Sequence, residues 1–221
     1  CHVVMDQLAH GGPINSVVGV FNGTCNYILT RMKELGRQQD EVIKEAQKLG
    51  YAERNPSEDI DGFDTEYKVR ILSMLVFGFK TPANRMLVEG MRGIGLEDIR
   101  FADQLGYEIR LVGILNKGGN MMDVRVHPAL VPKGTKFAFL RGVQNCIEID
   151  DILRGRGGAI YEGAGGAPAG SAIVQDLIDF ADGAPVNWPS RERFEKDVTL
   201  IPRQMIVSKY YLVFKALNKP G

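Results

Sequence analysis

Cysteine, net charge and long apolar runs are all scarce in this sequence of 221 residues. The three cysteines, Cys1, Cys25 and Cys146, are widely spaced and have no Cys-x-x-Cys pair or histidine cluster beside them. Neither a disulfide framework nor a metal site is therefore expected, and a reduced, cytoplasmic compartment fits better. The 27 basic and 27 acidic residues balance without a basic run, which argues against a nucleic-acid partner. No stretch approaches the roughly 18 consecutive apolar residues of a membrane span, so no membrane partner is expected.

Glycine, by contrast, is abundant. The sequence has 26 glycines, and seven of them fall between positions 155 and 170. The chain begins at Cys1 rather than methionine and ends at Gly221, shortly after a run of strand-like residues. Both ends are therefore interpreted as cuts, and we expect the chain to be a segment of a longer protein.

Hydrophobic periodicity predicts both helices and strands. The predicted strands are 14–21, 109–115, 122–126, 146–150, 159–162 and 210–217. The predicted helices are one that ends at Gly36, one capped by Asp40, one beyond Gly62, a short one at 96–105 and one at 173–181. Residues 53–61 are predicted to be a loop. Antiparallel strands with separate helices indicate an α+β fold, with a mixed, largely antiparallel sheet and helices packed on one face.

The segment from Glu53 to Lys68 is the most acidic part of the chain. Six carboxylates there face only two cations, Arg54 and Lys68. If a helix begins near Asp61, then Asp61, Asp64 and Lys68 share one of its faces. This pattern has three interpretations.

The simplest interpretation is a helix start that is enriched in acid because the macrodipole favours it, with Asp64 and Lys68 as an ordinary ion pair. A calcium loop starting at Ser57 would need a bidentate glutamate at its twelfth position, where Lys68 stands. The third interpretation is an active site for a small zwitterion or polar alcohol, in which Asp64 orients Lys68 for proton exchange. Spacing alone does not choose between the first and the third, but the neighbouring motifs favour the third.

Taken in order, those motifs resemble the homoserine dehydrogenase family over about residues 10–182. The matching blocks are 19–29 (GVFNGTCNYIL), 45–53 (EAQKLGYAE), 59–62 (DIDG) with Asp64 and Lys68, and 161–168 (YEGAGGAP). The resemblance implies an NAD(P)-dependent oxidoreductase that interconverts L-homoserine and L-aspartate 4-semialdehyde in threonine, methionine and isoleucine biosynthesis. It also implies a homodimer or homotetramer.

The resemblance further implies residue roles. Asp64 and Lys68 fall on the catalytic pair of the family, with Lys68 as the proton donor toward the aldehyde oxygen. The predicted substrate-binding residues are Glu53 and Asp59, which would hold the ammonium group, and Gly23 and Thr24, which would line the pocket. A positioned ammonium both stabilises and protonates the oxygen that receives charge when hydride reaches an aldehyde carbon.

The glycine cluster lies between a predicted strand and a predicted helix. Pro168 replaces the third glycine of a dinucleotide fingerprint, so the cluster is a weak candidate for the main pyrophosphate site. A strand-to-helix turn that needs positive φ is the simpler interpretation. By resemblance, Gly163, Ala164 and Gly165 approach the nicotinamide of NADP or NAD through their backbone. Glycines 155, 157 and 158 are expected in a flexible loop before the strand.

Three domain assignments follow from the resemblance. Residues 1–182 are predicted to be the substrate-binding and dimerisation domain, 183–207 a linker, and 208–221 the first strand and loop of a truncated ACT-like regulatory domain. The Rossmann domain that carries the main cofactor site is expected to be absent from this chain, so we expect the chain alone to be inactive. The alternative function is a non-catalytic amino-acid-binding sensor.

Overall fold

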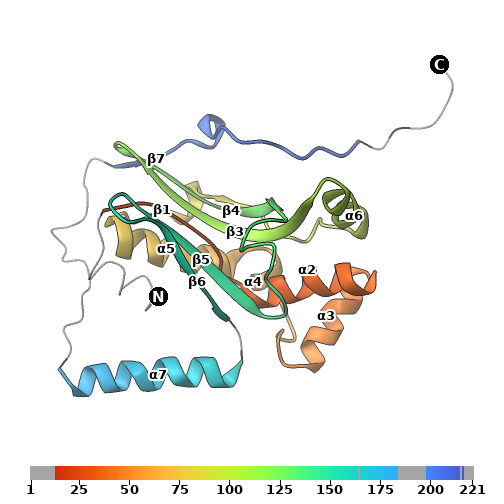
Figure 1. The fold of residues 1–221 in the computed structure, drawn as a ribbon, viewed down its shortest axis with the longest axis horizontal. Helices are drawn as coiled ribbons and strands as arrows, with labels where there is room; N and C mark the ends of the chain where they lie inside the picture. The colour runs from red at the N-terminus through yellow and green to blue at the C-terminus, as the bar shows by residue number, and fades with distance from the viewer. Residues whose placement is uncertain (1–12, 164, 184–197, 215, 217–221) are drawn as a thin grey trace.

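A seven-stranded sheet forms the centre of the structure, a computed structural model that describes residues 13–163, 165–183, 198–214 and 216 (Figure 1). Its strands are β1 (Ile14–Val20), β2 (Leu87–Val88), β3 (Tyr107–Gly118), β4 (Met121–Pro132), β5 (Gln144–Asp151), β6 (Gly155–Glu162) and β7 (Thr199–Leu200). The strand order is β2-β4-β3-β1-β5-β6, and β7 also pairs with β4. The long strands pair antiparallel, whereas the short β2 and β7 run parallel to β4.

The helices gather mainly on one face of this sheet (Figure 1). They are α2 (Gly23–Leu35), α3 (Gln39–Lys48), α4 (Ser57–Ile60), α5 (Phe63–Phe77), α6 (Leu96–Gln104) and α7 (Gly166–Ala181). Helices α2, α5 and α6 contact the strands, α3 packs on α2, and α4 contacts both α2 and α5. The predicted α+β class, with a mixed and largely antiparallel sheet, is therefore confirmed.

The alternation of side chains along β3 separates two cores. Leu111 and Leu115 point into the large core beneath the helices, whereas Val112 joins a smaller core on the other face. Successive residues of a strand face opposite sides, so the period of two predicted for 109–115 produces this division. The smaller core is closed by the segment that contains Ala138 and Leu140, which lies between β4 and β5.

Two helix ends follow local sequence signals, and one does not. Asn22 caps α2 by accepting a hydrogen bond from the Cys25 backbone N–H, and Gly36 ends that helix at φ 62°. The prediction that Asp40 caps the next helix is wrong, because α3 already begins at Gln39 and Gln38 occupies the cap position without a side-chain bond. Asp40 lies in the first turn instead, where the macrodipole favours a carboxylate.

Three further predictions are corrected by the structure. Residues 53–61 are not entirely loop, because α4 forms within them. Glycines 155, 157 and 158 belong to β6, where a side chain on Gly158 would overlap the Ile147 carbonyl of β5. The strand predicted at 210–217 is not formed over 210–214, where no described residue pairs with the backbone as a ladder partner. Residues 215 and 217 lie outside those described. The interpretation of 208–221 as ACT-like stays a prediction.

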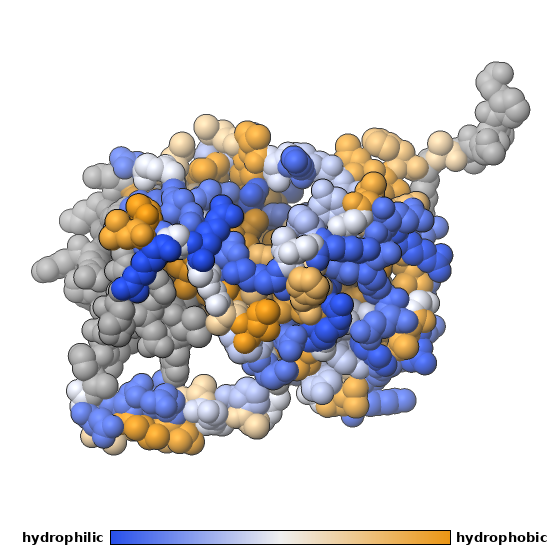
Figure 2. All heavy atoms as spheres, viewed as in Figure 1, coloured by the Kyte–Doolittle hydropathy of each residue, from blue (hydrophilic) through white to orange (hydrophobic). Residues whose placement is uncertain are grey.

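Helix α7 stands apart from the sheet, as Figure 1 shows. None of its residues is buried, and Figure 2 shows apolar side chains exposed along it. The helix begins at Gly166, earlier than the predicted 173. Across the described part of the chain, no helix combines the length and apolar character needed to cross a membrane.

Candidate active site

Asn22 stands at the junction between β1 and α2 and contacts both predicted carboxylate positions. Its Oδ1 accepts from the Cys25 backbone N–H at 2.7 Å. Its Nδ2 donates to Asp59 Oδ1 at 2.6 Å and to Asp64 Oδ2 at 2.8 Å. The capping residue therefore links α2, α4 and α5 at one point.

Asp64 and Lys68 form the predicted pair one turn apart on α5. Lys68 Nζ lies 2.7 Å from Asp64 Oδ2 and also donates to the Phe21 carbonyl at 3.0 Å. Gly62, with φ 86°, makes the sharp connection between α4 and α5 that brings Asp59 beside this pair. A left-handed residue at this junction favours glycine because it has no Cβ.

The electrostatics of Asp59 reflect burial among other acids. Burial raises the pKa of the Asp59 carboxyl, and the nearby charges of Asp64 and Glu53 raise it further, whereas the Asn22 hydrogen bond and Lys68 lower it. Glu53 is exposed and acts on Asp59 through its charge. The two residues predicted to hold an ammonium group therefore form one negatively charged edge, which suits a cation.

Gly23 and Thr24 form the first turn of α2 beside these carboxylates. A Cβ on Gly23 would lie 2.6 Å from the Val143 carbonyl oxygen, so glycine permits this close approach. The Thr24 hydroxyl donates to the Tyr51 carbonyl at 2.6 Å. Thr24 thus anchors the segment that leads to Glu53.

Gly163, one of the predicted cofactor residues, lies against Asn145 on β5. The Gly163 N–H donates to the Val143 carbonyl at 3.0 Å, and a side chain on Gly163 would overlap the Asn145 amide. Asn145 Nδ2 in turn donates at 3.3 Å to the Phe21 carbonyl, which also holds Lys68. Gly163 is thereby connected with Lys68 through the Asn145 amide and the Phe21 carbonyl.

The rest of the glycine turn is described in part. Gly165 precedes α7 with φ 114°, which agrees with the expected positive-φ turn. Ala164 lies outside the described residues.

The hydrogen-bond donors of the Lys68 ammonium group determine what this arrangement can do chemically. An ammonium has three donors, and two of them are directed at Asp64 and Phe21. Among the residues that the structure describes, none accepts from the third donor, which is open to a reacting oxygen. Because the Lys68 side chain is 44% exposed, solvent can return a proton to it. The site can therefore act as a general acid or base.

Two participating residues escaped the sequence-based site prediction. Asn22 lies in an Asn-Gly-Thr sequence that is typical of a turn or helix cap, and this capping signal is the one that could have directed attention to its amide. Asn145 has no local signal, because its partner Phe21 is 124 residues away in the sequence.

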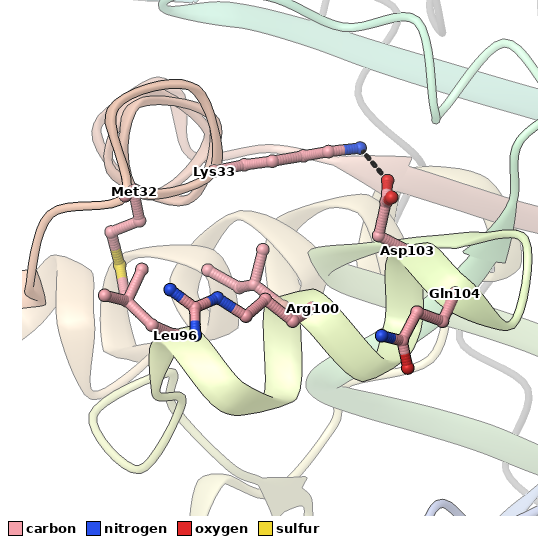
Figure 3. Close-up of a pocket in the computed structure, with 8 residues that line it drawn as sticks. Met32, Lys33, Leu96, Arg100, Asp103 and Gln104 are labelled. Atoms are coloured by element: carbon pink, nitrogen blue, oxygen red, sulfur yellow. Dashed lines mark ion pairs between the residues drawn. The ribbon is translucent and has the colours of Figure 1, made fainter.

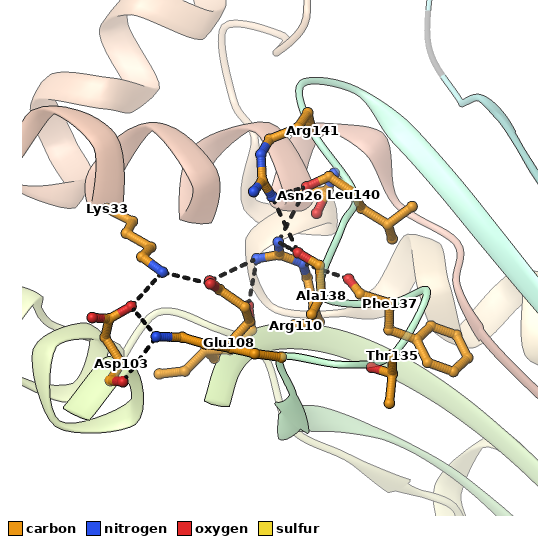
Figure 4. A network of polar contacts seen from close by, with 12 residues as sticks. Asn26, Lys33, Asp103, Glu108, Arg110, Thr135, Phe137, Ala138, Leu140 and Arg141 are labelled. Atoms are coloured by element: carbon orange, nitrogen blue, oxygen red, sulfur yellow. Dashed lines mark hydrogen bonds and ion pairs between the residues drawn. The ribbon is translucent and has the colours of Figure 1, made fainter. Parts of the chain in front are cut away.

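One cavity and one polar network among the described residues lie outside the predicted site. A cavity of about 240 Å³ lies between α2 and α6, with Met32, Lys33 and Asp103 among its lining residues (Figure 3). Beside it, Lys33 pairs with Glu108 and Asp103 in a network that continues to the buried Arg110 (Figure 4). No group of His, Cys, Asp and Glu able to hold a metal ion occurs among the described residues.

Comparison with known proteins identifies a family for this chain. The family model for homoserine dehydrogenase matches residues 2–178. The homoserine dehydrogenase of Neisseria gonorrhoeae is 37% identical over 215 residues, which are 94% of this chain and 49% of that protein. The one from Synechocystis is 35% identical, over 98% of this chain and 53% of that protein. The chain thus spans about half the length of these curated relatives.

Solved structures give the same result. The crystal structure of a homoserine dehydrogenase from Thiobacillus denitrificans matches with a TM-score of 0.80 and 35% identity, over 90% of this chain and 48% of that one. A hyperthermophilic archaeal homoserine dehydrogenase in complex with NADPH matches with a TM-score of 0.65 and 29% identity, over 78% of this chain and 49% of that one. A matching family model over most of the chain and these shared folds together show that the chain belongs to the homoserine dehydrogenase family.

Proposed function

We propose that this chain provides the substrate-binding and proton-transfer residues for the NAD(P)-dependent interconversion of L-homoserine and L-aspartate 4-semialdehyde. The observation that carries the proposal is the contact of Lys68 Nζ with Asp64 Oδ2 at 2.7 Å. The Asn22 amide holds Asp59 beside this pair. A second acid next to the pair supports recognition of a substrate that bears an ammonium group.

Lys68 carries the proton in this proposal. During reduction, negative charge develops on the aldehyde oxygen, and the Lys68 ammonium stabilises it and donates a proton to it. The resulting neutral amine regains its proton from solvent, and in the reverse direction it accepts the hydroxyl proton. Asp64 accepts a hydrogen bond from the Lys68 amine and so orients it.

The substrate's ammonium group pairs with Asp59 and with the charge of Glu53. The first turn of α2, which contains Gly23 and Thr24, borders the same pocket. The nicotinamide cofactor, when bound, supplies the hydride or accepts it. The backbone of Gly163 would lie against such a group on the side away from the Asn145 amide, which fills the space where a Cβ would stand.

The proposal is tested in the full-length gene product that contains this chain. Lys68→Ala should lower kcat for homoserine oxidation by about 10²- to 10⁴-fold, the range that a general acid or base contributes. Lys44→Ala, at an exposed position on α3, serves as the matched control and should leave the rate unchanged. Turnover that survives Lys68→Ala would contradict the assigned proton carrier.

The sensor alternative and the inactivity of the isolated chain are tested with the same material. Purified residues 1–221 should show no homoserine oxidation, and a rate abolished by Lys68→Ala would contradict this. Calorimetric titration of the full-length product with homoserine, NADP and threonine identifies a sensor as binding without turnover. We also propose a homodimer or homotetramer, which sedimentation equilibrium would contradict by showing only monomer.

A further inference from the structure

We propose that Asn22 is the positioning residue of this site: its amide holds one oxygen of Asp59 and one of Asp64, and leaves the second oxygen of each for substrate. The inference rests on the proposed function, since it concerns the same carboxylates. It assigns to Asn22 a task beyond capping α2.

The side-chain amide of Asn22 makes three hydrogen bonds, one with each N–H and one with its oxygen. Both N–H donors are directed at the carboxylates, and the carbonyl oxygen accepts from Cys25. Asn22 is only 3% exposed, so water does not compete for these groups. The cap also decides the orientation of the amide, because the reverse orientation would place its oxygen against two carboxylates and its N–H groups against another donor.

The donations divide each carboxylate into a held oxygen and an open one. Asp64 Oδ2 accepts from both Asn22 and Lys68, whereas no other described residue donates to Asp64 Oδ1. Asp59 Oδ1 is held by Asn22, and Asp59 Oδ2 has no donor among the residues that the structure describes. The open oxygen of Asp59 is therefore the acceptor that we assign to the substrate's ammonium group.

The amide also counteracts repulsion between the two acids. Two carboxylates that share a site raise the pKa of one of them, and a donated hydrogen bond opposes this by favouring the charged form. Asp59 is faced by Asp64 and Lys68 from α5, by Glu53 from the preceding loop, and by Cys25 from α2. Without Asn22, burial and the neighbouring acids would keep Asp59 protonated to a higher pH, where it cannot pair with an ammonium group.

Two variants of the full-length protein separate positioning from capping. Asn22→Ser keeps a good capping acceptor, but its single, shorter O–H donor cannot replace both N–H groups. We expect kcat/KM for homoserine to fall about 10- to 100-fold, the factor of a hydrogen bond to a charged group, with most of the change in KM. The acid limb of the pH profile should move to higher pH. Asn22→Asp also keeps the cap but adds a third carboxylate, and should lose more activity at neutral pH than Asn22→Ser.

Asn15 provides a matched control, because it lies on β1, the strand that precedes Asn22. Asn15 donates to Asp150 at 3.1 Å on the exposed surface, so Asn15→Ser removes an ordinary Asn–Asp bond and should leave the pH profile unchanged. An Asn22→Ser protein with the wild-type profile and a kcat/KM within twofold of wild type would overturn the inference, because capping alone would then explain Asn22.

A second measurement keeps this result distinct from the proposed function. The titration of Asp59 is followed by its ¹³C carboxyl signal, assigned with Asp59→Asn. Asn22→Ser should raise the midpoint even if wild-type protein does not oxidise homoserine, an outcome that would contradict only the proposed function. An unchanged midpoint would overturn the role of Asn22 whether or not the enzyme turns over.

Discussion

At the scale of single residues, ionisation distinguishes neighbours that look alike in the sequence. Asp59 and Asp61 both belong to the acidic segment, but burial raises the pKa of Asp59, whereas Arg92 donates two hydrogen bonds to Asp61 and lowers its pKa. A carboxyl with a raised pKa opposes folding once it is charged, and one with a lowered pKa supports folding. The two acids therefore contribute to stability with opposite sign.

This difference gives a pH-dependent prediction. Asp59→Asn should raise the midpoint of thermal unfolding at pH 7, because it removes a charge that burial disfavours. The gain should vanish as the pH falls below the raised pKa of Asp59, where the native carboxyl is already protonated. The same change should raise KM for homoserine about 10- to 100-fold, since it removes the charged partner of the ammonium group.

Asp61→Asn is the matched control and should behave in the opposite way. It removes a stabilising charge, so the unfolding midpoint at pH 7 should fall slightly. Native Asp61 loses this stabilisation as the pH falls through its lowered pKa, and the difference from wild type should disappear there. A lower midpoint at pH 7 for Asp59→Asn would contradict the assigned sign.

At the scale of elements, close approach of backbones joins α2 to the strands. Gly23 lies at the start of α2, where alanine would ordinarily stabilise a helix by up to about 1 kcal/mol. Here a Cβ would meet the Val143 carbonyl at 2.6 Å, and that carbonyl also accepts from Gly163. The contact between elements, rather than helix propensity, should therefore decide whether Gly23→Ala raises or lowers the free energy of unfolding.

We expect Gly23→Ala to lower the free energy of unfolding by about 1–3 kcal/mol, which is typical of overpacking. Denaturant unfolding measures this, with Gly134→Ala as the control. Gly134 is exposed, and nothing lies within 4 Å of its virtual Cβ, so the control should change stability by no more than about 0.5 kcal/mol. A stabilising Gly23→Ala would show that the elements can separate without loss.

At the scale of the whole molecule, a buried arginine joins the sheet to the segment that closes its second face. Arg110 on β3 is 2% exposed and donates to the carbonyls of Phe137, Ala138 and Leu140 (Figure 4). Burial lowers the pKa of its guanidinium to about 10, so Arg110 remains charged at neutral pH. Its fork of donors suits several carbonyls at once.

Arg110→Leu should leave the Phe137 carbonyl without its side-chain donor and leave the Ala138 and Leu140 carbonyls with Arg141 alone. We expect it to lower the free energy of unfolding by about 3–5 kcal/mol. Arg156→Leu is the control, since that side chain is 73% exposed and lies 3.8 Å from Asp150. It should change stability by no more than about 0.5 kcal/mol. Equal effects of the two substitutions, measured by denaturant unfolding, would contradict the structural role of Arg110.

The origin of the fold and the site can be divided between local pattern and tertiary structure. The sequence by itself determined the order of the main elements, the two faces of β3, the ends of α2, and the pairing of Asp64 with Lys68. These features depend on residues within a few positions of one another, through helical or strand periodicity and capping. Family resemblance extended this to Asp59 and Gly163, which no local pattern brings together.

Only the tertiary structure decided which groups meet across the chain. Asn22 is shared between Asp59 and Asp64, and the Phe21 carbonyl is shared between Lys68 and Asn145. Both depend on the register of β1 with β5, on the packing of α4 against α2, and on the packing of α5 against β3 and β4. The absence of a ladder over 210–214 has the same origin, since a strand requires a partner that its own residues do not supply. Hydrogen bonds between distant segments are geometric consequences of the whole fold, so periodicity along the chain could not reveal them.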